Sequence, residues 1–149
     1  MGKSRSKRTF LRHHSLSLAT GGILLLWIIL YSFSDPSKHL GSFFGNAIAD
    51  WTGVVVMVLA TKYLYERGSA ESRRPPQVTS LARQWLENHS LTIFLLLTGI
   101  AWVVLYISMD SEGKWGQVVG NIVSEWTQIL GLLVLTKRLV ESRSKESAR

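Results

Sequence analysis

Two short motifs combine a carboxamide and a carboxylate four residues apart. Asn46 and Asp50 form the first motif, and Asn121 and Glu125 form the second. On a helix, residues with this spacing lie on one face. Each motif is followed by a tryptophan, a threonine and an apolar run. A carboxylate within an apolar helix is a candidate proton or cation site, with the amides as neutral ligands.

The two motifs belong to a repeat with one constant offset. Residues 14–74 align without a gap with residues 89–149, and 20 of the 61 positions are identical. A repeat of this size predicts two copies of one structural unit. The identical pairs include His14/His89, Ser15/Ser90, Trp27/Trp102, Tyr31/Tyr106, Asp35/Asp110, Lys62/Lys137 and Glu66/Glu141.

Four apolar windows define the expected fold. Their lengths are close to the ~20 residues that a membrane-spanning helix needs, and none alternates as a barrel strand does. The sequence predicts an all-α integral membrane protein in which four transmembrane helices form two tandem hairpins of the same orientation. A pseudo-twofold axis would then run along the membrane normal. The windows are residues 16–33, 43–61, 91–107 and 118–136.

The segments outside the windows are polar and basic. The N-terminal arm has nothing to bury and is expected to contact anionic headgroups. Residues 80–87, with Trp85, are interpreted as a short interfacial lead-in to the third span. The expected parts are a basic cytoplasmic arm (1–12), a first two-helix repeat (13–72), a cytoplasmic linker (73–87) and a second two-helix repeat with a polar C-terminal tail (88–149).

The distribution of basic residues predicts the topology. Of the 17 lysines and arginines, 15 precede the first span, lie between the second and third, or follow the fourth, and only Lys38 and Lys114 lie elsewhere. The positive-inside rule places both termini and the central loop in the cytoplasm. The same rule accounts for the net charge of +7, so no nucleic-acid partner is expected. The interface markers are Lys62, Arg67, Lys137 and Arg138.

The depth of the two motif carboxylates follows from these markers. Each carboxylate is twelve residues before Lys62 or Lys137, or about 18 Å along a helix. In a hydrocarbon core of ~30 Å, the carboxylates would lie roughly 12 Å below the outer boundary. Tyr31 and Tyr106 reach a similar depth and are candidate hydrogen-bond donors. A carboxylate at this depth should be protonated, paired or in contact with water.

The second and fourth spans begin with small residues at every fourth position. Such a ridge lets helices approach closely. We expect it to form a packing seam, either between the two hairpins or between protomers. The ridge residues are Gly41, Gly45 and Ala49 in the first half and Gly116, Gly120 and Ser124 in the second.

A histidine and a serine open the first and third spans. Ser15 and Ser90 are placed to cap free backbone N–H groups at the start of a helix. His14 and His89 are interpreted as interfacial side chains, with pH sensing as the alternative.

These repeated segments resemble an uncharacterised bacterial membrane-protein family of two tandem two-helix hairpins. In that family each half begins with a segment like His-Ser-Leu-Ser-Leu, carries Asn-x-x-Ser-Glu before an aromatic residue and ends in Gly-Ser-x-Glu-Ser. This chain departs from the pattern at Asp50 and Arg143 and has shorter outer loops. The resemblance implies the fold and a localisation in a bacterial inner membrane, and it implies no activity. The matching segments are residues 14–18, 46–51, 68–72, 89–91, 121–126 and 144–147.

The sequence does not favour an enzyme. It has no cysteine, no histidine within a span and no phosphate-binding glycine loop. Asp35 and His39 could ligate a metal, but the counterpart of His39 is Lys114, so no metal site and no cofactor are expected. The favoured role is structural or accessory, and the alternative is a small proton or cation channel or transporter that uses Asp50 and Glu125. The expected partners are the lipid bilayer and a second copy or another membrane protein.

Overall fold

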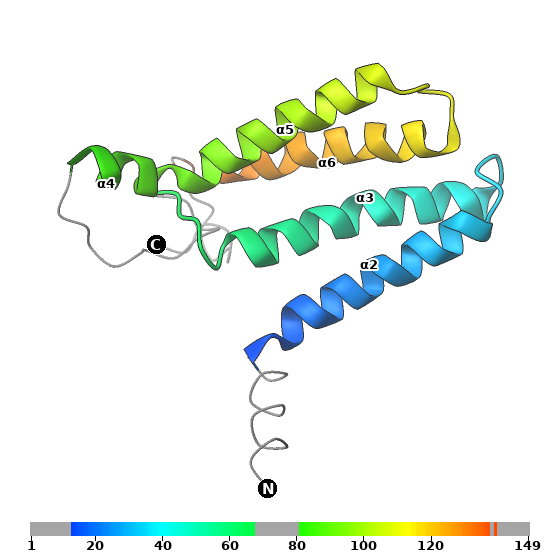
Figure 1. Ribbon diagram of the computed structural model, residues 1–149, viewed down its shortest axis with the longest axis horizontal. Helices are drawn as coiled ribbons and strands as arrows, with labels where there is room; N and C mark the ends of the chain where they lie inside the picture. Colours follow the sequence, from blue (N-terminus) through cyan, green and yellow to red (C-terminus); the bar gives the residue numbers. More distant parts are fainter. Residues whose placement is uncertain (1–12, 68–80, 138, 140–149) are drawn as a thin grey trace, which may run out of the picture. The chain divides into compact units, whose positions relative to one another are not determined.

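The computed structural model describes residues 13–67, 81–137 and 139 (Figure 1). Within these residues the regular structure is helical and contains no strand. The predicted basic arm, Arg138 and nearly all of the C-terminal tail lie outside the described residues, as does most of the linker. The helices are α2 (Ser15–Phe33), α3 (His39–Ala60), α4 (Leu81–Asn88), α5 (Ser90–Ser108) and α6 (Lys114–Leu135).

Four of these helices, α2, α3, α5 and α6, are long and apolar enough to cross a membrane. The prediction of an all-helical fold with four helices long and apolar enough to span a membrane is therefore confirmed for the described residues. α3 and α6 each begin four residues before the predicted window, at His39 and Lys114, because the helix continues through polar residues that hydropathy excludes. The helices of the second half begin and end at the repeat counterparts of the residues that bound α2 and α3.

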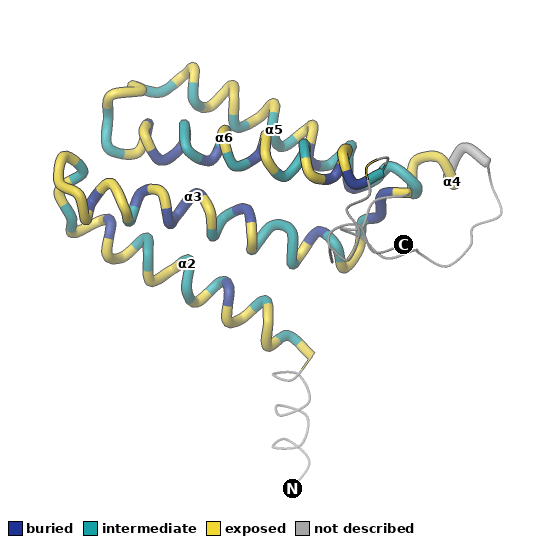
Figure 2. Tube along the Cα trace, turned by 180° about the vertical axis from the view of Figure 1, so that it is seen from behind, coloured by how far each residue is buried: buried dark blue, intermediate teal, exposed yellow. Residues whose placement is uncertain are grey.

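The chain divides into two compact units, Met1–Leu59 and Ala60–Arg149. In the first unit, α2 and α3 lie closest near the loop that joins them and diverge away from it (Figure 1, Figure 2). α2 ends where Ser34 adopts an extended backbone, and Pro36, which lacks an N–H group, follows. The indole ring of Trp27 packs against the rings of Phe43 and Phe44, with centroids 5.7 and 5.8 Å away.

Both hairpin loops fold around an aspartate. The Oδ1 atom of Asp35 accepts hydrogen bonds from the backbone N–H and the hydroxyl of Ser37, at 3.0 and 2.7 Å. In the second unit, Oδ1 of Asp110 accepts a bond from the Glu112 N–H at 3.1 Å. Such bonds close a tight turn without strand or helix pairing, which explains why the aspartate recurs in both halves.

Glycine is required where each loop meets the next helix. A Cβ atom on Gly41 would overlap the backbone carbonyl oxygen of Asp35, and one on Gly116 would overlap that of Asp110. These neighbours are backbone atoms that cannot rotate away, so a larger residue must displace the loop.

The next ridge glycines contact tyrosine rings. A Cβ atom on Gly45 would lie 3.2 Å from the Tyr31 ring, and one on Gly120 would lie 2.9 Å from the Tyr106 ring. Tyr31 is only 1% exposed. These contacts lie inside each hairpin, whereas the seam was predicted between hairpins or between protomers.

In the second unit, α5 and α6 lie side by side (Figure 1, Figure 2). The indole N–H of Trp126 on α6 donates a hydrogen bond to the Thr98 hydroxyl on α5 at 2.9 Å. The ring of Trp102 meets Trp126 edge-on, with centroids 5.8 Å apart. Gly99 gives the indole room, since a Cβ there would lie 3.1 Å from it. A buried indole N–H needs an acceptor in lipid, and Thr98 supplies it.

Replacing Gly116 by alanine should lower the unfolding free energy of the purified protein by about 1–3 kcal/mol, because the new methyl group displaces backbone. Thermal unfolding in detergent measures this change. Gly131→Ala is the matched control on the same helix, since a Cβ there meets nothing within 4 Å. Equal stability of the two variants would contradict the proposed role of Gly116.

Replacing Thr98 by valine should cost between about 0.6 and 1.7 kcal/mol, the range for polar contacts between membrane helices. The variant keeps the side-chain shape and leaves the Trp126 N–H without its acceptor. Thr127→Val on the exposed side of α6 is the control, because the Thr127 hydroxyl bonds within its own helix, to the Ser124 carbonyl. The same loss in both variants would argue against the Trp126–Thr98 bond as a tie between helices.

Candidate functional site

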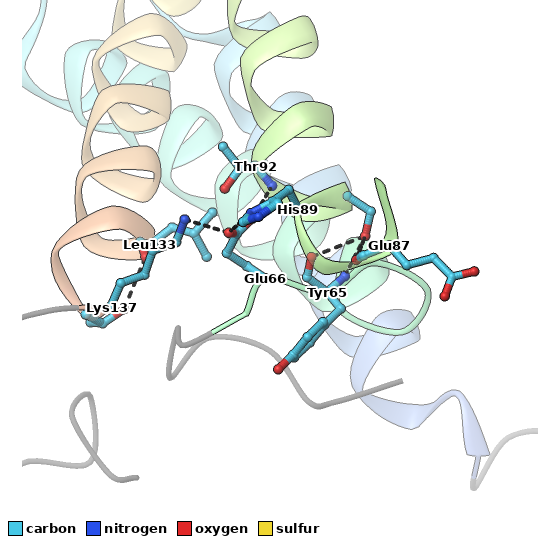
Figure 3. A network of polar contacts seen from close by, with 9 residues as sticks. Tyr65, Glu66, Glu87, His89, Thr92, Leu133 and Lys137 are labelled. Atoms are coloured by element: carbon cyan, nitrogen blue, oxygen red, sulfur yellow. Dashed lines mark hydrogen bonds and ion pairs between the residues drawn. The ribbon is translucent and has the colours of Figure 1, made fainter. Parts of the chain in front are cut away.

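A buried carboxylate in the second unit gathers the polar groups at one end of α5 and α6. Glu66 lies outside the spanning helices, and its side chain is 0% exposed. Its Oε1 atom lies 2.7 Å from Nδ1 of His89 and 2.5 Å from Nζ of Lys137 (Figure 3). Its Oε2 atom accepts the backbone N–H of Thr92 at 3.3 Å. We call these four residues the Glu66 cluster.

The segment around Glu66 caps the start of α5. The first N–H groups of a helix have no partner within the helix. Here the Tyr65 carbonyl accepts a hydrogen bond from the Leu91 N–H at 3.1 Å. The Glu66 carboxylate accepts one from the N–H of the next residue, Thr92. Ser90 was expected to act as the cap, but its hydroxyl accepts the Tyr65 N–H at 2.8 Å instead. The cap of α5 therefore comes from a segment more than twenty residues upstream.

Several effects set the ionisation of Glu66. Burial acts to raise its pKa, because a buried charge loses hydration. Hydrogen bonds from Lys137, Thr92 and His89, together with the charge of Lys137, outweigh burial and hold the pKa of Glu66 below its usual value. The carboxylate is therefore ionised at neutral pH, and its negative charge is favourable at the N-terminal end of α5.

The cluster can hold helices together and exchange a proton with solvent. The side chains of His89 and Lys137 are 33% and 25% exposed, so they connect the buried carboxylate with water. The distance of 2.7 Å between His89 Nδ1 and Glu66 Oε1 is short enough for a proton to pass between the two atoms. Within residues 13–67 and 81–137, no group of three or more histidine, aspartate or glutamate side chains could hold a metal ion.

The Glu66 cluster was not predicted from the sequence. The sequence predicts Lys137 to be an interface marker and His89 to be an interfacial side chain, and it shows Glu66 only as a residue identical to Glu141 in the repeat. A signal was present, because each of these three residues has an identical counterpart in the other half of the repeat. A polar residue that recurs in both halves just outside a span is a candidate to make a structural contact in each half.

The predicted proton or cation site is divided between the two units. Asn46 and Asp50 are exposed on α3 in the first unit. In the second unit, Asn121 and Glu125 are half-buried on α6, and Tyr106 is half-buried on α5. Because the carboxylates belong to different units, their pairing stays a prediction.

The remaining predicted residues are spread over the helix faces and ends. Ala49 is buried and Ser124 is exposed. The interface markers Lys62 and Arg67 are exposed after the end of α3. Arg138 lies outside the described residues.

One face of α6 is polar along three turns. Gln117, Asn121, Ser124 and Gln128 follow one another at spacings of four, three and four residues, which place them on one side of a helix. All but the half-buried asparagine are exposed. At the same helical spacing, the buried Trp126, which donates a hydrogen bond to Thr98 on α5, lies on the opposite side of α6. The same spacing was readable from the sequence.

No protein family, no curated protein and no solved structure matches this chain. The resemblance to a family of tandem two-helix hairpins therefore stays a prediction from the motifs.

The stability of the purified protein in detergent should decrease as the pH falls below about 4.5, the usual pKa of this side chain. Since the pKa of Glu66 is lowered on folding, the unfolded carboxyl takes up its proton first, and acid favours unfolding. The contribution of Glu66 is complete above that value and is lost as the pH falls through the lower, folded pKa.

The matched variant is Glu66→Gln, which keeps the shape and removes the charge. At neutral pH it should be less stable than the wild type by about 1.5–3 kcal/mol, the range for hydrogen bonds to charged groups. The difference should shrink in acid. A difference of the same size at neutral pH and at about pH 3 would argue against an ionised Glu66.

Proposed function

We propose that this chain is a multi-pass membrane protein with a structural or accessory role, without catalytic activity. The observation that carries the proposal is the Glu66 cluster, in which a fully buried carboxylate joins the start of α5 to the residue Lys137 beyond the end of α6. Polar side chains used in this way connect helices. The Trp126–Thr98 bond connects the same two helices within their spans.

The proposed topology has two tandem hairpins of the same orientation in a bacterial inner membrane, with both termini in the cytoplasm. It is supported by the placement of 15 of the 17 basic residues on one side of the expected spans. The constant offset between the helix bounds of the two halves supports the duplication. A pseudo-twofold axis along the membrane normal follows from two units of equal orientation.

A second candidate function is the passage of protons or cations along Asp50 and Glu125. It is favoured by the exposure of Asp50 and by the exposed polar face of α6. A charged side chain facing lipid costs about 2.5–3.5 kcal/mol on insertion scales. Contact with water in a conducting path would avoid that cost. Contact with a partner protein would avoid it equally, and this alternative agrees with the accessory role.

Flux through liposomes separates the two candidates. The structural proposal predicts that proton and cation flux in liposomes with wild-type protein equals the flux in empty liposomes. The variant with Asp50→Asn and Glu125→Gln should behave in the same way. Glu112→Gln, at an exposed loop carboxylate, is the control for charge loss alone. Flux in the wild type and in this control that disappears in the double variant would overturn the structural proposal in favour of conduction.

A further inference from the structure

The short helix α4 lies directly before a spanning helix. α4 (Leu81–Asn88) has eight residues, and only His89 separates it from Ser90, the first residue of α5. Figure 1 shows α4 leading into α5 at the end away from the α5–α6 loop. α5 is long and apolar enough to cross a membrane, and a short helix joined directly to its start is therefore a candidate to meet the membrane surface.

α4 has one apolar and one polar side. With 100° between successive residues, Trp85 and Leu86 fall on the apolar side, and Gln84 and Glu87 fall on the polar side. Trp85 is 60% exposed and Leu86 is 55% exposed. The Trp85 ring also lies 5.3 Å from the ring of His89, which fixes it beside the start of α5. Two large exposed apolar side chains at this level match the headgroup layer of a membrane, where tryptophan is enriched.

Positive charge lies beside the end of α4. The backbone N–H of Arg67 donates a hydrogen bond to the Asn88 carbonyl at 2.8 Å, and Arg67 is exposed. The guanidinium group binds phosphate oxygens in a two-pronged geometry. A basic residue near an anionic membrane surface is attracted to it.

We propose that α4 lies in the headgroup layer of the bilayer, with Trp85 and Leu86 in the lipid, and that Arg67 binds the phosphate of an anionic phospholipid. The occupant of this surface is lipid because α4 leads directly into α5, a helix long and apolar enough to cross the bilayer. In this position the apolar side of α4 is removed from water, and its polar side stays in contact with water.

Spin labels test the depth of α4 in the full-length protein. The chain has no cysteine, so Leu86→Cys and Gln84→Cys each create one labelling site, and the second is the matched control on the polar side. In nanodiscs of phosphatidylcholine and phosphatidylglycerol, the label at 86 should collide with oxygen more than with a water-soluble nickel complex, and the label at 84 should do the reverse. Labels with equal, water-like accessibility would overturn the proposal.

Lipid charge tests the role of Arg67. The label at 86 should lie deeper in nanodiscs with phosphatidylglycerol than in nanodiscs of phosphatidylcholine alone. Arg67→Gln should reduce this difference in depth at least two-fold, whereas Lys38→Gln, at an exposed lysine of the first unit, should leave it unchanged. Equal depth in both lipids, or no effect of Arg67→Gln, would overturn the assignment of an anionic lipid to Arg67.

Discussion

The second unit depends on the ionised carboxylate of Glu66, whose own side chain is not exposed to solvent. Glu66 accepts bonds from His89, Lys137 and the Thr92 backbone, and together these bonds compensate for the hydration that burial removes. Because the partners come from the start of α5 and from beyond the end of α6, the carboxylate fixes both helix ends. Loss of one partner would leave charge buried without compensation, which is costly.

A membrane makes such contacts necessary, because burial of apolar surface does little to join helices that are already surrounded by lipid. The structure uses close contacts on glycine and hydrogen bonds between side chains instead. Gly45 and Gly120 accommodate a tyrosine ring in their own hairpins. The Trp126–Thr98 bond has no equivalent in the first unit, because Ile23 stands at the position of Thr98 in the repeat. The two units therefore share a plan and differ in their polar contacts.

The spanning helices were predictable from the sequence and the Glu66 cluster was not. Backbone groups in lipid must be satisfied within a helix, so an apolar run of sufficient length nearly determines the structure there. The contacts of Glu66 follow no local periodicity: His89 is 23 residues away and Thr92 is 26 residues away along the chain. For the same reason the cap of α5 was assigned to Ser90, the local candidate, when the groups that cap it come from Tyr65 and Glu66.

The most direct test of the structural role is a double-mutant cycle between Glu66 and Lys137. The unfolding free energy in detergent is measured for the wild type, Glu66→Gln, Lys137→Met and the double variant. A direct contact predicts a coupling energy above about 0.5 kcal/mol, with the double variant losing less than the sum of the single variants. Additive losses would contradict the claim that this carboxylate joins α5 to the end of α6.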